Sequence, residues 1–350
     1  MAQIDIFNGD AFGIVEMSDA LDKVEFQPNF LGSLGIFTPN PIRTKMVGVE
    51  ERNGVLTLIP VSERGAPIEE GGRERRKMRY FETTRIAKGT TIYADEIQGI
   101  RAFGSESEMQ AVQSEVARKY DGPTGILSDV ELTFEHMRLG ALQGIVLDAD
   151  GATELVNWYD EWGIAQPAEI DFALGAAGTD IRTICANLVR DMARAGRGAF
   201  TPATQIHALA GDTFYDGLIN HPTVKETYLN QAAANELRTG QVTAGGNGSF
   251  GSFTYGGITF HNYRGMDDQT RVAVDPGKAK FFPVGARGVF EHVMSPAEFM
   301  PFVNTPGRRV YGMTVVDRQR QAWVRPEAYA YPLFMCTRPE LLFRADDGIA

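Results

Sequence analysis

The spacing of apolar residues predicts one well-defined helix, from Asp180 to about Arg194. Its apolar positions share one face: Ile181, Ile184, Leu188 and Met192. The Asp180 carboxylate is suited to cap the first turn, and residues 195–198, with two glycines, end the helix. The segment is therefore expected to bury a single face.

Three further segments carry a capping-box signature, in which a serine caps the first turn and a glutamate three residues later reaches back. They are Ser105 with Glu108, Ser128 with Glu131, and Ser295 with Glu298. The first helix is expected to bury Met109, Val112, Val116 and Tyr120. The second, from Ser128 to about Val146, carries a less regular set: Phe134, Leu139, Leu142 and Val146. Residues 212–218 and 222–237 are candidate helices.

Short apolar runs predict the strands. The candidates are residues 55–59, 80–86, 205–209, 257–263 and 279–284, with a hairpin at 309–316 and a last apolar segment at 328–343. Residues 80–86 are interpreted as the return strand of 55–59. Asp150 and Gly151, between two apolar runs, indicate a tight hairpin turn. Residues 240–257 contain seven glycines and are expected to form a mobile loop.

Composition places the chain among globular proteins. Its 350 residues can bury a sizeable core, and 43% of them are hydrophobic and 23% charged. No apolar run approaches the ~18–20 residues of a membrane-spanning helix, and the N-terminus lacks the pattern of a secretory signal. The net charge of −11 argues against a general nucleic-acid binder, because such proteins need a basic surface.

Residues that often carry chemistry are scattered. Cys185 and Cys336 lie in apolar surroundings and are expected to be buried, reduced thiols. The five histidines are isolated in the sequence, and none has the spacing that places two metal ligands on one helix face. No nucleophile elbow and no phosphate-binding Walker loop occurs. No catalytic residue, cofactor or metal is therefore predicted.

Three motifs admit a chemical interpretation, and for each the structural interpretation is favoured. Residues 246–251 match the dinucleotide fingerprint, but the following residues are interpreted as strand, where that fingerprint requires a helix. Asp148 and Asp150 resemble the start of a calcium loop whose remaining ligands are missing. Asp160 and Glu161 could serve a sugar cleft, yet adjacency does not establish the separation of an acid and a base. A polar turn beside an aromatic anchor is favoured there.

Two segments that lack a core of their own carry opposite charge. Residues 1–40 contain the single base Lys23 and six acids: Asp5, Asp10, Glu16, Asp19, Asp22 and Glu25. Residues 62–79 form a long connection that carries six bases: Arg64, Arg73, Arg75, Arg76, Lys77 and Arg79. Most charge runs are solvated surface loops. A connection of this length is nevertheless uncommon in a compact domain unless it has a binding role.

The order of these segments resembles the E-type major capsid proteins of lambda-like tailed bacteriophages. The matching segments are residues 30–37, 44–50, 54–60, 64–67 and 144–159. The resemblance extends from about Met17 to about Phe343. Its specificity lies in the order of the segments, since none of them is a signature by itself.

The resemblance implies the Hong Kong 97-type capsid fold, which is α+β and has five parts. They are an N-terminal arm and lead-in (1–50), an extended loop hairpin (51–94), a peripheral domain with a spine helix (95–170), an axial domain (171–325) and a C-terminal return to the peripheral domain (326–350). The implied function is that of a major capsid protein, not an enzyme. Such a protein self-assembles into the hexamers and pentamers of an icosahedral head that encloses double-stranded DNA.

In that family the extended loop overlaps the adjacent subunit. The six loop bases and the six arm acids are therefore expected at contacts between subunits. Further expected partners are a portal, a possible decoration protein, DNA held without specific binding and, because the family motifs begin by about Met17, a separate scaffolding protein. The protein is expected in the virion, after assembly in the host cytoplasm. Alternatives are an encapsulin-like compartment shell protein or a cytosolic enzyme with an unrecognised site.

Overall fold

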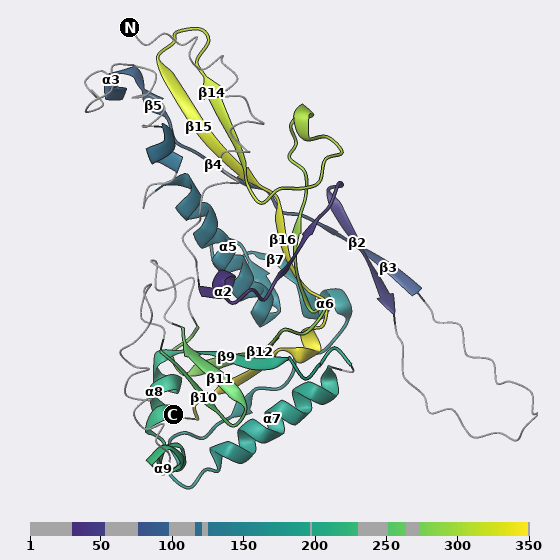
Figure 1. Cartoon of the computed structure of the whole chain (residues 1–350), viewed down its shortest axis with the longest axis vertical. Coiled ribbons are helices and arrows are strands. Elements are labelled where there is room, and N and C mark those ends of the chain that lie inside the picture. Colours follow the sequence, from purple (N-terminus) through teal and green to yellow (C-terminus); the bar gives the residue numbers. More distant parts are fainter. Residues whose placement is uncertain are drawn as a thin grey trace, which may run out of the picture.

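The structure of the chain is a computed structural model, which describes residues 30–52, 76–97, 116–120, 125–196, 198–229, 251–263 and 274–348. Helices and strands are mixed along these residues, so the expected α+β class is confirmed. Figure 1 shows the helix α5 between an upper group of strands and a lower sheet, with a two-stranded ribbon projecting to one side.

The lower half is built on a six-stranded sheet with the strand order β10-β11-β9-β12-β17-β8. The strands are β8 (Ile170–Asp171), β9 (Gln205–Ala210), β10 (Ser252–Tyr255), β11 (Ile258–Asn262), β12 (Lys278–Val284) and β17 (Phe343–Asp346). The helices of this half are α7 (Ile181–Ala195), α8 (Asp212–Asn220) and α9 (Pro222–Leu229). Strand β9 pairs in parallel with β11 and antiparallel with β12, which puts its apolar residues at the centre of the sheet.

The upper half contains two small sheets around α5 (Ile126–Gln143). One joins β14 (Tyr311–Val316), β15 (Trp323–Ala330), β4 (Ile86–Gly89) and β5 (Ile92–Tyr93). The other has the order β1 (Thr38–Pro41), β13 (Phe290–Met294), β16 (Pro332–Cys336). Short helical elements complete this half: α2 (Phe30–Ser33), α3 (Ala94–Ile97), η3 (Met300–Phe302) and η4 (Pro339–Leu341).

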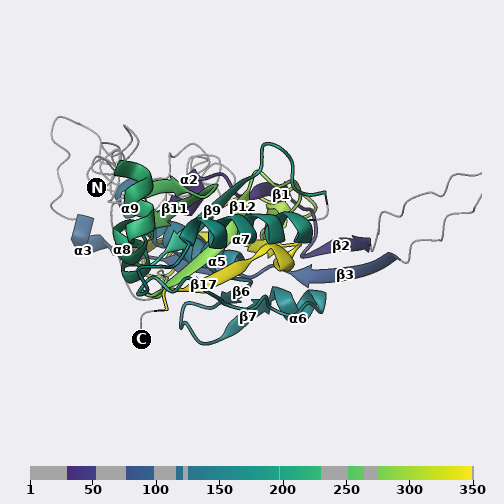
Figure 2. The same cartoon turned by 90° about the horizontal axis from the view of Figure 1, so that it is seen from below.

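The ribbon consists of the antiparallel strands β2 (Met46–Arg52) and β3 (Arg76–Glu82). Figures 1 and 2 both show it extending beyond the body of the subunit. Next to its root lie the hairpin of β6 (Ile145–Leu147) and β7 (Glu154–Asn157), and the helix α6 (Trp158–Trp162).

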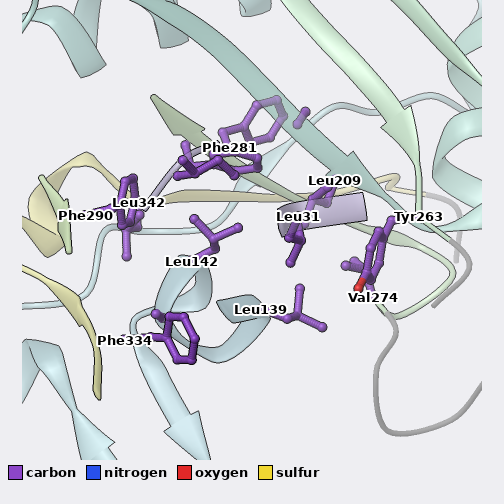
Figure 3. Close-up of a cluster of buried hydrophobic side chains, with 14 of the residues drawn as sticks. Leu31, Leu139, Leu142, Leu209, Tyr263, Val274, Phe281, Phe290, Phe334 and Leu342 are labelled. Carbon is purple, nitrogen blue, oxygen red and sulfur yellow. The ribbon is translucent and has the colours of Figure 1, made fainter. Parts of the chain in front are cut away.

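One hydrophobic core joins the two halves. Figure 3 shows Leu142 of α5 between Phe334 of β16 and Phe281 of β12, and Leu139 of α5 next to Leu31 of α2, so the helix contributes to the packing of both groups of strands. Burying a large apolar side chain contributes roughly 1.5–3 kcal/mol. The shared core therefore favours folding of the described body as one unit.

Local signals predicted the lower half well. Helix α7 begins after Asp180, whose side chain accepts a hydrogen bond from the Thr183 N–H, and it buries Ile181, Leu188 and Met192. Strands β9, β11 and β12, helix α8 and the hairpin β6–β7 form where they were expected. The hairpin predicted within residues 309–316 was wrong, because residues 311–316 form the single strand β14 and its partner β15 lies at residues 323–330. Residues 116–120 are helical as predicted, with Val116 and Tyr120 buried, whereas Ser105 to Val112 lie outside the described residues. Strand β10 occupies the end of the expected glycine-rich loop.

The predicted bounds of α5 were wrong. The helix begins at Ile126, behind Gly125, and the predicted cap Ser128 lies inside its first turn. Glu131 does not reach back to a cap, because its carboxylate pairs with Arg138 at 2.9 Å. At the other end Gly144 adopts φ 85°, a left-handed conformation, and stops the helix three residues early. A Cβ at Gly144 would lie 2.3 Å from the Tyr159 ring, so only glycine fits there.

The capped helix predicted at Ser295 was also wrong. Residues 295–299 are irregular, and only the single turn η3 follows. The Ser295 hydroxyl lies 2.8 Å from the Thr83 hydroxyl, and Glu298 pairs with Arg85 at 3.1 Å. Both side chains of the supposed capping box are thus used by contacts with the segment after β3, distant in sequence.

Strand pairing bears on two expectations. Strand β3 pairs with β2, with Gly48 opposite Tyr80, so the partner of the return strand is residues 46–52; the predicted strand 55–59 lies outside the described residues. In addition, β17 pairs with β12 in the lower sheet, while β14 pairs with β15 in the upper half. The pairing therefore places residues 343–346 in the lower sheet and residues 311–316 in the upper half, while the division into axial and peripheral domains stays a prediction.

Candidate assembly surface

The inner face of the ribbon is anchored by aromatic rings. Phe81 on β3 is buried, with its ring centroid 5.3 Å from that of Trp158 and 5.6 Å from that of Trp162. Asn157 caps α6 by accepting two backbone N–H groups of its first turn, which fixes the position of both tryptophans. The ribbon root is therefore rigidly attached to the body.

Arg79 belongs to this inner face. Its guanidinium carbon lies 5.5 Å from the centroid of the Trp162 ring, and its Nη1 donates a hydrogen bond to the Glu161 carbonyl oxygen. A guanidinium over an indole face is attracted by the ring quadrupole. Arg79, predicted to contact a neighbouring subunit, thus makes contacts within its own chain.

The outer face of the ribbon is exposed and carries large apolar side chains, together with the exposed Glu82 opposite Met46. Met46, Met78 and Tyr80 lie on it, and they are 49%, 57% and 63% exposed. Gly48 lies opposite Tyr80, and a Cβ there would be 3.3 Å from the Tyr80 ring. The glycine leaves room for the ring to lie across the strands. Exposed apolar side chains gathered on one face are typical of a binding surface.

Most of the predicted contact residues fall outside the described part of the chain. These are Arg64, Arg73 and Arg75 of the loop and all six acids of the arm. Arg76 and Lys77 lie on β3, opposite Arg52 and Glu51 in the strand register. Because none of the arm acids is among the described residues, the contact between the loop bases and the arm acids stays a prediction.

The place where the arm joins the body is held by a buried carboxylate. Glu135 of α5 accepts hydrogen bonds from the Leu31 N–H at 2.9 Å and the Tyr263 hydroxyl at 3.2 Å, and it lies 3.5 Å from Arg138. Burial raises the pKa of Glu135, although the Leu31 hydrogen bond and Arg138 oppose this effect. Phe30 packs against Tyr263 in the same place. Nothing in the local sequence pattern predicted this role for Glu135.

Two histidines predicted to be isolated are in contact. Nδ1 of His207 on β9 lies 2.8 Å from Nε2 of His261 on β11, and both side chains are buried. Burial lowers the pKa of His207, and burial together with the neighbouring ring lowers the pKa of His261 to about 3. The Phe30 ring covers His261 with a centroid distance of 5.0 Å. The pair is neutral at neutral pH and forms part of the support for α2.

The remaining candidate groups have structural roles. Cys185 and Cys336 are buried and unpaired with each other, as predicted, and burial raises the pKa of the Cys185 thiol to about 12. Asp160 and Glu161 lie in α6 beside the tryptophan anchor, as the structural interpretation had it. Within the described ranges, no cluster of three or more metal-ligating side chains occurs. None of the helices described there has the length and apolar character needed to cross a membrane.

Comparison with known proteins identifies the class of protein to which this surface belongs. The profile of the family described as phage major capsid protein E matches residues 13–346. The major capsid protein of Salmonella phage Felix O1 (isolate Felix O1-VT1) is 27% identical, over 94% of this chain and 96% of its own. The major capsid protein of Pseudomonas phage KPP10 is 26% identical, over 86% and 88%. The capsid structure of the cyanophage P-SCSP1u aligns with a TM-score of 0.47 and 11% identity, over 89% and 86%.

The family match covers nearly the whole chain, including the six-stranded lower sheet, the two small upper sheets, α5 and the ribbon. The chain belongs to the phage major capsid protein E family, as the resemblance had indicated.

Proposed function

We propose that the protein forms the head shell of a tailed phage, as hexamers and pentamers of a Hong Kong 97-type subunit that close into an icosahedron. The ribbon with one anchored and one uncovered face is the observation that carries this proposal. The side chains of its inner face pack against α6 of the same subunit. Its outer face has no packing partner within the subunit among the described residues. A second copy of the chain supplies that partner.

The mechanism is assembly through repeated contacts. A head-to-tail interface forms when a surface of one copy binds a different surface of the next copy. Repeating such an interface generates a closed ring when the rotation between successive copies adds up to a full turn. Each subunit in a ring is held on both sides. Breaking one contact leaves it held by the other, so modest contacts produce a persistent shell. The loop bases Arg64, Arg73, Arg75, Arg76, Lys77 and Arg79 and the arm acids are proposed to extend these contacts.

Further partners belong to the same proposal. They are a separate scaffolding protein, a portal, a possible decoration protein and packaged double-stranded DNA. The net charge of −11 supports containment of DNA without tight binding, because binding DNA requires a basic surface. The proposed place of the protein is the virion, after assembly in the host cytoplasm. The encapsulin-like alternative is not favoured, because the curated relatives reported above are phage capsid proteins. Proteins of this family serve a structural role, which leaves an enzymatic function without support.

Electron microscopy of the purified full chain, combined with size-exclusion chromatography, tests the proposal. Capsomers or closed shells are expected, with Tyr80→Asp as a comparison variant that places a charge on the exposed outer face. If the wild-type chain gives only a small closed oligomer under all conditions that keep it folded, the proposal is wrong.

A further inference from the structure

A second apolar surface lies on the loop between β13 and β14. Met300 at its tip is 88% exposed, and Val303, three residues later, is 56% exposed. Residues 299–307 contain no charged side chain, although 23% of the chain is charged. Depletion of charge together with exposed methionine is typical of the core of a protein interface. We call residues 296–306 the apolar loop; its one charged residue, Glu298, pairs with Arg85 of the same chain.

The apolar loop is held rigidly by a small core beneath it. Phe302 is buried, and its ring centroid lies 4.7 Å from that of Tyr311. The Tyr311 hydroxyl accepts the Arg308 N–H at 2.8 Å and donates to the Ser295 carbonyl oxygen at 3.2 Å, which ties the two ends of the loop together. Because the loop is ordered before binding, association loses little conformational entropy there.

Three prolines add to this rigidity: Pro296, Pro301 and Pro306. At its end the Gly307 N–H donates to the Ile42 carbonyl oxygen at 2.8 Å. A Cβ at Gly307 would lie 2.1 Å from the Met294 carbonyl oxygen, so only glycine permits this approach. The apolar loop is thus fixed to the segment that leads into the ribbon of the same subunit.

The outer face of the ribbon has the matching character. Among the described residues, the large hydrophobic side chains that remain exposed are Met46, Met78 and Tyr80 on the ribbon, Met300 and Val303 on the apolar loop, and Tyr93 on β5. The ribbon strand β2 has seven residues, and seven antiparallel residues span about 24 Å. Figure 1 shows the ribbon directed away from its own body, where a neighbouring copy would lie in a ring.

We propose that the outer face of the ribbon of one subunit docks on the apolar loop of a second copy of this chain, with Tyr80 and Met78 covering Met300 and Val303. This inference rests on the proposed function and specifies its contact. The contact is head-to-tail, since the two surfaces differ. Because each apolar loop is fixed to the root of its own ribbon, docking on one loop also positions the next ribbon around the ring.

Photo-cross-linking in assembled shells of the full chain tests the contact. A benzophenone maleimide is attached to Tyr80→Cys; the native Cys185 and Cys336 are fully buried and do not compete. Shells are assembled from a mixture of the labelled variant and unlabelled chains enriched in ¹⁵N, so that mass spectrometry separates cross-links between copies from those within one copy. Arg194→Cys, on the exposed side of α7, carries the same probe as the control.

The expected product joins position 80 of one copy to residues 296–306 of another. Adding Met300→Gln with Val303→Thr to the unlabelled chain is expected to reduce this product about tenfold, as a loss of 1.4 kcal/mol would. A cross-link to another part of a second copy overturns the docking inference and leaves the proposed ribbon contact intact. Three outcomes overturn both the docking inference and the proposed ribbon contact: cross-links confined to one copy, cross-links to a different protein, or a cross-link yield equal to that of the control.

Discussion

The two faces of the β2–β3 ribbon differ in what covers them. On the inner face Phe81 packs between Trp158 and Trp162, and Val47 is buried beside it. On the outer face Met78 and Tyr80, which alternate with the inner residues along the same strand, are more than half exposed. Alternate residues of a strand point to opposite faces. One short strand therefore serves folding with one half of its residues and leaves the other half for association.

This difference separates the stability of the subunit from the stability of the assembly. Substitutions on the inner face remove contacts that the isolated subunit already makes. Substitutions on the outer face remove contacts that exist only between copies.

Trp158→Ala is expected to destabilise the subunit most. The side chain is fully buried and anchors Phe81, and truncating a buried aromatic residue costs about 3–5 kcal/mol because it leaves a cavity. Urea denaturation followed by circular dichroism measures the change. Trp323→Ala, at a partly exposed tryptophan, is the matched control and is expected to cost less. Equal losses for the two variants would mean that α6 is not the anchor.

Acidification is expected to weaken the body through His207 and His261. The pKa of His261 is lowered to about 3 in the folded state, against ~6.5 in an unfolded chain. Between these values the unfolded state binds more protons, so the free energy of unfolding falls as the pH falls from about 6.5 towards 3. The expected loss is about 1–3 kcal/mol.

Urea denaturation at pH 7 and pH 4 compares the wild type with His261→Asn. The variant is expected to lose less stability between these two pH values, because it lacks the buried titrating ring. Glu135, whose raised pKa acts in the opposite direction, and His292, whose pKa is also lowered, are present in both proteins. An identical pH dependence would show that the histidine pair is not responsible.

Neutralising the loop bases is expected to affect assembly more than folding. In Arg73→Gln, Arg75→Gln, Arg76→Gln and Lys77→Gln combined, the subunit should lose less than about 1 kcal/mol, since the sequence pattern predicts a solvated charge run and such charges contribute little to stability. Shell yield should fall. The rate at which capsomers join should also depend less on salt, because salt screens attraction between charges more than ~8 Å apart and the variant has fewer such charges. Deleting residues 1–25 should weaken the salt response in the same way. Normal shells with an unchanged salt response would exclude these charges as contacts.

Tyr80→Ala is expected to have the smallest effect on the isolated subunit, within about 0.5 kcal/mol, as for an exposed position. Its effect on shell yield should nevertheless exceed that of the loop-base variant, because aromatic anchors dominate interfaces. Negative-stain particle counts at equal protein concentration measure it. Unimpaired assembly would place the contact elsewhere.

The sequence predicted those elements whose signals are local. Asp180 caps α7 and the apolar spacing that follows sets its buried face, so this helix was predicted almost to the residue. At α5 the capping box of Ser128 and Glu131 failed, because Glu131 forms a buried pair with Arg138 and contacts Arg309, which lies far away in the sequence. Local propensity is a weak prior that such tertiary contacts override.

The candidate surface was only partly accessible from the sequence. The charged loop and the aromatic anchor beside Asp160 were visible as patterns, and the family resemblance supplied the role of the loop. The pairing of the ribbon strands could not be predicted from the sequence, since the register of β2 against β3 depends on which face is buried against α6. His207 and His261 are 54 residues apart and meet only because β9 and β11 are neighbours. No spacing rule within one element predicts such a pair.

Electron cryo-microscopy of assembled shells tests the central claim most directly. The account predicts that the outer face of the ribbon, with Met46, Met78 and Tyr80, is buried against a second copy of the chain in every hexamer and pentamer, while the inner face keeps its contacts with α6. A shell in which this outer face remains open to solvent would contradict the account.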